Sequence, residues 1–206
     1  MTPRLNITVG RQLGSGGGQI AKRLAEIFNC QLYDRELLNL AARESGFSAD
    51  LFEHSDEQKN FLDSLGATLF SSRAAAFGSR LSNNLNSEEA LFQFQSDAIR
   101  KAASQNDCVF VGRCTDYILR DEPRCVNIFI TAPLEQRLKR VMERHQCDEQ
   151  KALKILNGKE HRRANYYNFY TGKRWGVAES YDLCIDSSIL GIEGTAAFIA
   201  EFIKQK

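Results

Sequence analysis

The sequence predicts an α/β fold of three layers, in which a parallel sheet of about five strands carries helices on both faces. Three observations support this prediction. Short apolar runs typical of buried strands recur along the chain, helical patterns fill the intervals between them, and a glycine cluster connects the first strand to the first helix. A chain of 206 residues with 43% hydrophobic residues can bury a full core. We therefore expect residues 1–206 to form a single domain.

The first βαβ unit is predicted near the N-terminus. Residues 5–9 form an apolar, β-branched run that indicates a buried strand. After the glycine cluster the period changes, because apolar residues from Ile20 to Phe28 recur at helical spacing. Residues 31–33 indicate a second strand that ends at Asp34. Strand, glycine-rich turn, helix and strand in this order form one βαβ unit.

Three further strands are predicted over residues 108–111, 126–131 and 183–185. A helix is expected to begin near Pro133, since proline is favoured in the first turn of a helix, and residues 192–203 carry the apolar stripe of a terminal helix. Strands that alternate with helices indicate a parallel sheet covered on both faces.

Residues 53–106 show no strand pattern. Helix formers and polar residues dominate this stretch, and residues 88–103 carry apolar side chains at helical spacing. We interpret residues 53–106 as a helical insertion into the domain rather than as a second domain.

Composition excludes several classes of function. A formal net charge of +1 gives no global attraction to nucleic acid or to an anionic membrane, so neither is expected as a partner. The 6 cysteines form no C-x-x-C pair and the 3 histidines are isolated, so no metal-ligating set is expected. The first residues lead into an apolar run too short for a signal peptide or a membrane span, and we therefore expect a cytoplasmic location.

The glycine cluster is a candidate phosphate-binding turn. Glycines allow the backbone to approach a ligand closely with its N–H groups pointing inward, and the following helix start adds unpaired donors and a favourable dipole. A tight turn that binds nothing is the alternative, but four glycines within residues 14–18 exceed what a turn requires. The residues predicted to bind phosphate are Gly14, Ser15, Gly16, Gly17, Gly18 and Gln19.

The cluster matches a phosphate-binding P-loop only in part. The P-loop pattern is G-x-x-x-x-G-K-[ST], and Gly14 to Gly16 fit its second half. Gly17 takes the lysine position, Gln19 stands where the magnesium-binding hydroxyl is expected, and Gly10 lies one residue too far back for the first glycine.

A dinucleotide-binding G-x-G-x-x-G motif is the rival interpretation. Gly14 and Gly16 satisfy its start, and Asp34 ends the second strand, where such folds hold a ribose. The third glycine of the motif would fall at Gln19, which leaves this interpretation in second place.

The second candidate feature is a basic segment that runs from Arg137 to Arg174. It contains 11 Lys and Arg against 4 Asp and Glu, a local excess of +7 in a chain of net charge +1. Within it, residues 145–175 are predicted to form a lid whose Arg162 and Arg163 close over phosphate, because the guanidinium fork pairs with phosphate oxygens. Two alternatives remain: a solvated helix face, or a surface for single-stranded nucleic acid with stacked aromatic side chains.

In order along the chain, these segments resemble the cytidylate kinase-like family, a branch of the P-loop nucleoside monophosphate kinases. The resemblance extends from the first predicted strand to beyond Asp186. Its stretches are ITVGRQ (7–12), GSGG (14–17), YDRELL (33–38), VGRCTDYIL (111–119), YTGKRWG (170–176) and YDL (181–183).

The resemblance implies a P-loop kinase fold and transfer of the ATP γ-phosphate to CMP or a related pyrimidine nucleotide, with ATP and Mg²⁺ as cofactors. By this analogy, residues 14–19 would hold the donor phosphates, and the insertion would help to bind the acceptor. The lid arginines would act in catalysis, and small-molecule nucleotides would be the partners. The residues implied on the acceptor side are Asp34, Arg35 and Arg113.

Three positions depart from ordinary cytidylate kinases. These have lysine where Gly17 stands, threonine near Gln19, and aspartate where Cys114 stands. Asp116 is the candidate to compensate for the last of these, if it points into the same cleft. Lys22 lies on the polar face of the helix and is not expected to replace the lysine. Gly17 and Gln19 also favour an alternative function, a non-catalytic nucleotide-binding regulatory protein on the same fold.

Overall fold

The computed structural model describes residues 3–34 and 88–206. The chain divides into two compact units, Met1–Tyr33 with Ala102–Lys206, and Asp34–Lys101. The second unit overlaps the predicted insertion, most of which lies outside the described residues, as does Arg35. That residues 1–206 form one domain stays a prediction.

A parallel sheet forms the centre of the first unit. Its strands are β1 (Asn6–Arg11), β2 (Gln31–Tyr33), β3 (Cys108–Val111), β4 (Cys125–Thr131) and β5 (Leu183–Asp186), in the order β2-β3-β1-β4-β5. Every pairing between neighbours is parallel. The five strands confirm the sequence prediction, and their carboxyl ends therefore lie at one edge of the sheet.

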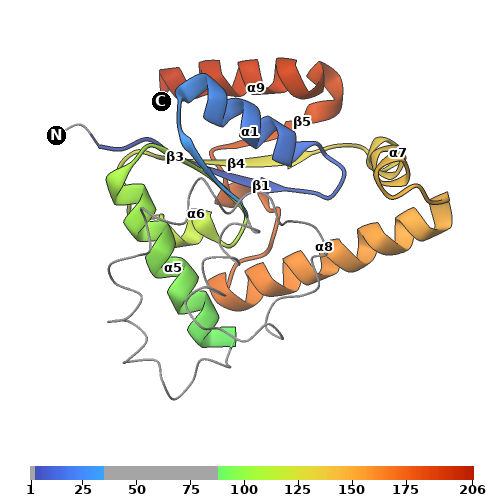
Figure 1. Ribbon diagram of the computed structural model, residues 1–206, viewed down its shortest axis with the longest axis horizontal. Coiled ribbons are helices and arrows are strands. Elements are labelled where there is room, and N and C mark those ends of the chain that lie inside the picture. Colours follow the sequence, from blue (N-terminus) through green and yellow to red (C-terminus); the bar gives the residue numbers. More distant parts are fainter. Residues whose placement is uncertain (1–2, 35–87) are drawn as a thin grey trace, which may run out of the picture. The chain divides into compact units, whose positions relative to one another are not determined.

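Helices cover both faces of this sheet. Helices α1 (Gly17–Phe28) and α9 (Ser187–Gln205) lie together on one face, whereas α6 (Thr115–Ile118) and α8 (Glu149–Thr171) lie on the other (Figure 1). Helix α7 (Leu134–His145) follows β4. This three-layer arrangement is the one that the alternation of strand and helix patterns predicted.

Helix α8 carries most of the predicted lid. Asp148 is the N-cap of this helix, and its side chain accepts a hydrogen bond from the Lys151 N–H at 2.8 Å. Gly172 is the C-cap and takes the left-handed conformation that closes many helices. A short 3₁₀ helix (Ala178–Ser180) then connects to β5. Helix α5 (Glu88–Gln105) agrees with the helix predicted over residues 88–103.

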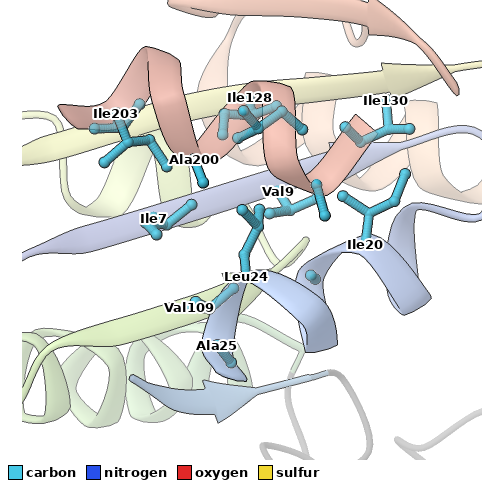
Figure 2. Packing of buried hydrophobic residues seen from close by; sticks show 14 of the residues in the cluster. Ile7, Val9, Ile20, Leu24, Ala25, Val109, Ile128, Ile130, Ala200 and Ile203 are labelled. Carbon is cyan, nitrogen blue, oxygen red and sulfur yellow. The ribbon is translucent and has the colours of Figure 1, made fainter. Parts of the chain in front are cut away.

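The main core lies between the sheet and the pair α1 and α9. Figure 2 shows Ile20 and Leu24 of α1 directed at Ile7 and Val9 of β1, and all four side chains are fully buried. Apolar residues from α9 complete the cluster at the same helical spacing that the sequence shows. Burial of β1 on both faces explains why its sequence is a continuous apolar run rather than an alternating one.

All six cysteines are free thiols. Burial raises the pKa of Cys108 to about 12, so this strand thiol is neutral at physiological pH. Within the described ranges, none of the helices combines the length and apolar character needed to cross a bilayer.

The packing of α1 gives a test of the core. Replacing Leu24, which has no exposed surface, with alanine should lower the free energy of unfolding by about 2–5 kcal/mol, because a cavity is left in a packed interior. Ile27→Ala on the same helix is the matched control, since Ile27 is 41% exposed and should cost about 1 kcal/mol or less. Urea unfolding measures both, and equal losses would contradict this assignment of the buried face.

Candidate functional site

The candidate site lies at the carboxyl ends of β1 and β3, which are neighbours in the sheet. From β1 the chain passes through α1 to β2, which lies on the β3 side of β1 in the sheet. From β3 it passes to β4, which lies on the opposite side of β1, so the two connections run in opposite directions. Ligands of open α/β sheets bind in the crevice outside such a pair of strand ends, where the connections diverge. Two segments flank this point, the glycine-rich loop after β1 and the turn after β3.

Backbone geometry explains two of the loop's glycines. Gly14 and Gly16 have φ angles of 78° and 80°, a left-handed conformation that other residues adopt only at a cost. At Gly14 an added Cβ would also lie 2.6 Å from the backbone oxygen of Arg137. Gly16 is the residue that immediately precedes α1.

Ser15 organises the loop from within. Its buried hydroxyl donates to the Gln12 carbonyl oxygen at 2.9 Å and accepts from the Gly17 N–H at 3.3 Å, while the Ser187 hydroxyl donates to the Ser15 carbonyl oxygen. The next two N–H groups, those of Gly18 and Gln19, belong to the first turn of α1 and have no acceptor within the helix. Both residues are exposed. The N–H groups of residues 18 and 19 are therefore donors available to an anion.

Helices α7 and α8 brace the loop from outside. A single Glu160 carboxylate oxygen accepts from the Leu13 N–H at 3.1 Å and from Arg137 Nη1 at 2.7 Å. Arg140 Nη1 donates to the Gly14 carbonyl oxygen at 3.0 Å. The excess of basic residues from Arg137 onward was the signal in the sequence, but no pattern indicated that these arginines bind the loop backbone.

The predicted lid arginines occupy different environments. Arg163 is partly buried, and its Nη1 donates to the carbonyl oxygen of Arg11, the last residue of β1, at 3.1 Å. Arg162 is exposed on α8. The structure thus brings Arg163 of the lid to the start of the glycine-rich loop, 152 residues away in the sequence.

The turn after β3 has an uncommon backbone. Gly112, Arg113 and Cys114 have consecutive left-handed φ angles of 76°, 59° and 57°. Two hydrogen bonds hold the turn, from the Gly112 N–H to the Val9 carbonyl oxygen at 3.1 Å and from the Thr115 hydroxyl to the Gly112 carbonyl oxygen at 2.9 Å. Non-glycine residues in this conformation are strained, and such strain is concentrated at functional sites.

Arg113 links this turn to α8. Its guanidinium carbon lies 5.2 Å from the centre of the Tyr166 ring on α8, within range of a cation–π interaction. The turn after β3 and helix α8 are therefore in contact through Arg113 and Tyr166. Asp34 directly follows β2.

Cys114 and Asp116 differ in the charge and the hydrogen bonding of their side chains. The Cys114 side chain is buried, and burial raises its pKa to about 12, so it is a neutral thiol and cannot act as the carboxylate that it replaces. Asp116 Oδ2 accepts a hydrogen bond of 2.6 Å from the Tyr167 hydroxyl on α8. Burial raises the pKa of Asp116, while the bond from Tyr167 acts in the opposite direction. Asp116 therefore fastens α6 to α8.

The loop does not fit a Mg²⁺ ion held directly by the protein. P-loop proteins supply a Ser or Thr hydroxyl, and carboxylates are the other usual protein ligands. Here neither Gly18, which directly follows the lysine position of the pattern, nor Gln19 carries a hydroxyl, and the Ser15 hydroxyl is engaged inside the loop. Over residues 3–34 and 88–206, no cluster of three or more His, Cys, Asp or Glu side chains could hold a metal.

The Glu160 brace gives a prediction for stability. Glu160→Ala should lower the free energy of unfolding by about 3 kcal/mol, because Arg137, whose side chain is 10% exposed, would lose its ionic partner. Glu201→Ala removes an exposed pair with Lys204 and should cost less than about 1 kcal/mol. Denaturant titration measures both variants. If Glu160→Ala loses no more free energy of unfolding than the control, the contacts of Glu160 do not stabilise the fold.

The Tyr167–Asp116 bond predicts a pH dependence. Tyr167→Phe removes the donor, so the already raised pKa of Asp116 should rise further. A carboxyl whose pKa is higher in the folded than in the unfolded chain destabilises the fold as pH rises above the ordinary value of 3.8. The stability loss of Tyr167→Phe should therefore grow with pH from acid to neutral, reaching about 1–3 kcal/mol.

Thermal unfolding across pH measures this effect. Tyr117→Phe on α6 is the control, since the Tyr117 ring lies against Arg120 with 4.4 Å between the ring centre and the guanidinium carbon. Its effect should be small and independent of pH. A pH-independent loss for Tyr167→Phe would argue against an ionised Asp116 as the acceptor.

Known proteins share the fold of this chain. An uncharacterized protein from Eubacterium ventriosum has a crystal structure that is similar to this chain, with a TM-score of 0.74, 28% identity and coverage of 98% of this chain and 100% of that one. Shikimate kinase from Bacteroides thetaiotaomicron shares the P-loop kinase fold, with a TM-score of 0.53, 10% identity and coverage of 97% and 98%. No curated protein matches the sequence. The model of the cytidylate kinase-like family matches residues 6–189, and the chain therefore belongs to the cytidylate kinase-like family.

Proposed function

We propose that this protein transfers the γ-phosphate of ATP to a nucleoside monophosphate, with CMP or a related pyrimidine nucleotide as the acceptor. Family membership supports kinase-like chemistry. The observation that carries the proposal is the contact of Arg163 with the end of β1, because it joins a lid arginine to the glycine-rich loop. Phosphoryl transfer requires this combination of a positioned phosphate chain and cations near the developing charge.

On the donor side, the loop of residues 14–19 binds the phosphates of ATP. The N–H groups of the exposed residues Gly18 and Gln19 and the positive end of the α1 dipole attract the anion. The braces from Arg140 and Glu160 fix the loop backbone before the nucleotide arrives, so binding does not have to order it. Arg163, together with Arg162 from the same helix, stabilises the phosphoryl group during transfer.

On the acceptor side, Arg113 binds the phosphate of the monophosphate. The strained turn fixes its position, and Tyr166 supports its guanidinium from the lid. Asp34 and Arg35 contribute after β2, and the insertion over residues 53–106 supplies further contacts. Asp116 acts here by orienting α8 through Tyr167. Since Cys114 cannot supply a carboxylate, selection among pyrimidine bases falls to other residues of the acceptor site.

A regulatory protein that binds nucleotides without turnover is the second candidate. Two observations favour it: Gly17 leaves the lysine position without a cation, and the Ser15 hydroxyl is engaged inside the loop. Removal of a positioned transition-state donor costs about 100- to 1,000-fold in rate, so such departures bear on catalysis more than on binding.

An assay of the full chain with ATP, magnesium and each nucleoside monophosphate tests the proposal. We expect turnover with a pyrimidine monophosphate, and Arg163→Ala should lower kcat by about 100-fold or more. Lys154→Ala, at an exposed position of the same helix, should leave kcat unchanged.

The outcomes separate the candidates. ATP binding without turnover of any monophosphate would establish the regulatory protein and refute the kinase. Absence of both binding and turnover in folded protein would refute both. A rise in melting temperature with a nicotinamide dinucleotide, but not with ATP, would instead favour the dinucleotide interpretation.

A further inference from the structure

Two departures from the P-loop pattern concern the same pair of contacting residues. In G-x-x-x-x-G-K the first glycine precedes the second by five positions, so aligning the second with Gly16 places the first at Arg11 and the lysine at Gly17. This chain therefore has arginine where the pattern has glycine, and glycine where the pattern has lysine. In both the pattern and this chain, positions 11 and 17 together therefore hold one cationic side chain and one glycine.

Arg11 and Gly17 are in direct contact. A Cβ added to Gly17 would lie 2.5 Å from Arg11 Cβ and 3.0 Å from Arg11 Cγ. Because atoms do not pack this closely, the stem of Arg11 fills the space in which a side chain at position 17 would begin. A lysine at position 17 does not fit beside Arg11, so the two departures depend on each other.

The Arg11 guanidinium lies at the divergence point between β1 and β3. A Cβ added to Gly112 would lie 2.2 Å from Arg11 Nη1 and 3.4 Å from Cζ, so the charged group rests against the backbone of the turn after β3. The Arg11 carbonyl oxygen accepts the hydrogen bond from Arg163, and Arg113 is the next residue of the turn. Lys22, by contrast, is exposed on the polar face of α1.

We propose that Arg11 supplies the cation that position 17 lacks and binds the terminal phosphates of the donor nucleotide. This inference rests on the proposed function, because it requires ATP in the glycine-rich loop. Arginine suits the role, since its fork can contact two phosphate oxygens and keeps its charge at any physiological pH. Gly17 and Gly112 give its side chain a path across the strand ends, so the loop retains a positioned cation despite its irregular sequence.

Four proteins test the inference: the wild type, Arg11→Gln, Gly17→Lys and the double variant with Arg11→Gly and Gly17→Lys, in which the Cβ of residue 11 is also removed. Arg11→Gln retains most of the stem that packs on Gly17 but removes the charge. The affinity for ATP is measured by titration calorimetry, with CMP as the reference ligand and thermal unfolding as the check of the fold.

Arg11→Gln should weaken ATP binding by about 10- to 100-fold, the loss expected for a charged hydrogen bond, and leave CMP binding unchanged. Gly17→Lys alone should lower the melting temperature without improving ATP binding, because its Cβ collides with Arg11. The double variant, in which the stem of Arg11 is absent, should bind ATP within a few-fold of the wild type.

Three results would overturn the inference. Equal ATP affinity in the wild type and Arg11→Gln would refute the role of Arg11 while leaving the proposed kinase standing. A lower melting temperature with unchanged ATP affinity would show that Arg11 only supports the turn. If the double variant is folded and binds ATP no better than Arg11→Gln, a lysine at position 17 does not replace Arg11, and the two positions do not supply the same cation. Absence of ATP binding by the wild type would refute this inference together with the proposed function.

Discussion

The parallel pairing of β1 with β3 on one side and β4 on the other is the constraint on which the site depends. Val9 of β1 lies level with Val111 of β3 and Ile128 of β4, so the three strands end at the same edge. This register places the glycine-rich loop and the strained turn side by side, and the buried apolar core beneath them fixes it. A shift of one residue would turn the core side chains of β1 to the opposite face.

A loop made of glycines does not hold its own shape, because glycine loses more conformational freedom on folding than any other residue. Here the surrounding helices determine the shape of the loop. Glu160, Arg140 and Arg163 each bind a backbone group between Arg11 and Gly14. The basic segment therefore has a structural role, since its Arg140 and Arg163 bind backbone carbonyl groups of the loop. Movement of α8 would disturb the loop and the lid together.

The sequence predicted the five strands well, because buried parallel strands form continuous apolar runs and the intervening helices have a distinct period. It did not predict the contacts of Arg137 with Glu160 or of Asp116 with Tyr167. These pairs are 23 and 51 residues apart and follow no local pattern, so only the packing of α6, α7 and α8 brings them together.

The sequence by itself determined the order of the elements, the family and the glycine-rich loop after β1, since each depends on local residue pattern. The tertiary structure decided which charged groups meet that loop. In the sequence, Gly17 stands where the P-loop pattern has lysine, and Arg11 is an ordinary strand residue. In the fold, the stem of Arg11 occupies the space beside Gly17 and its guanidinium reaches Gly112, because close approach between residues on different segments depends on packing and leaves no periodic signal in the chain.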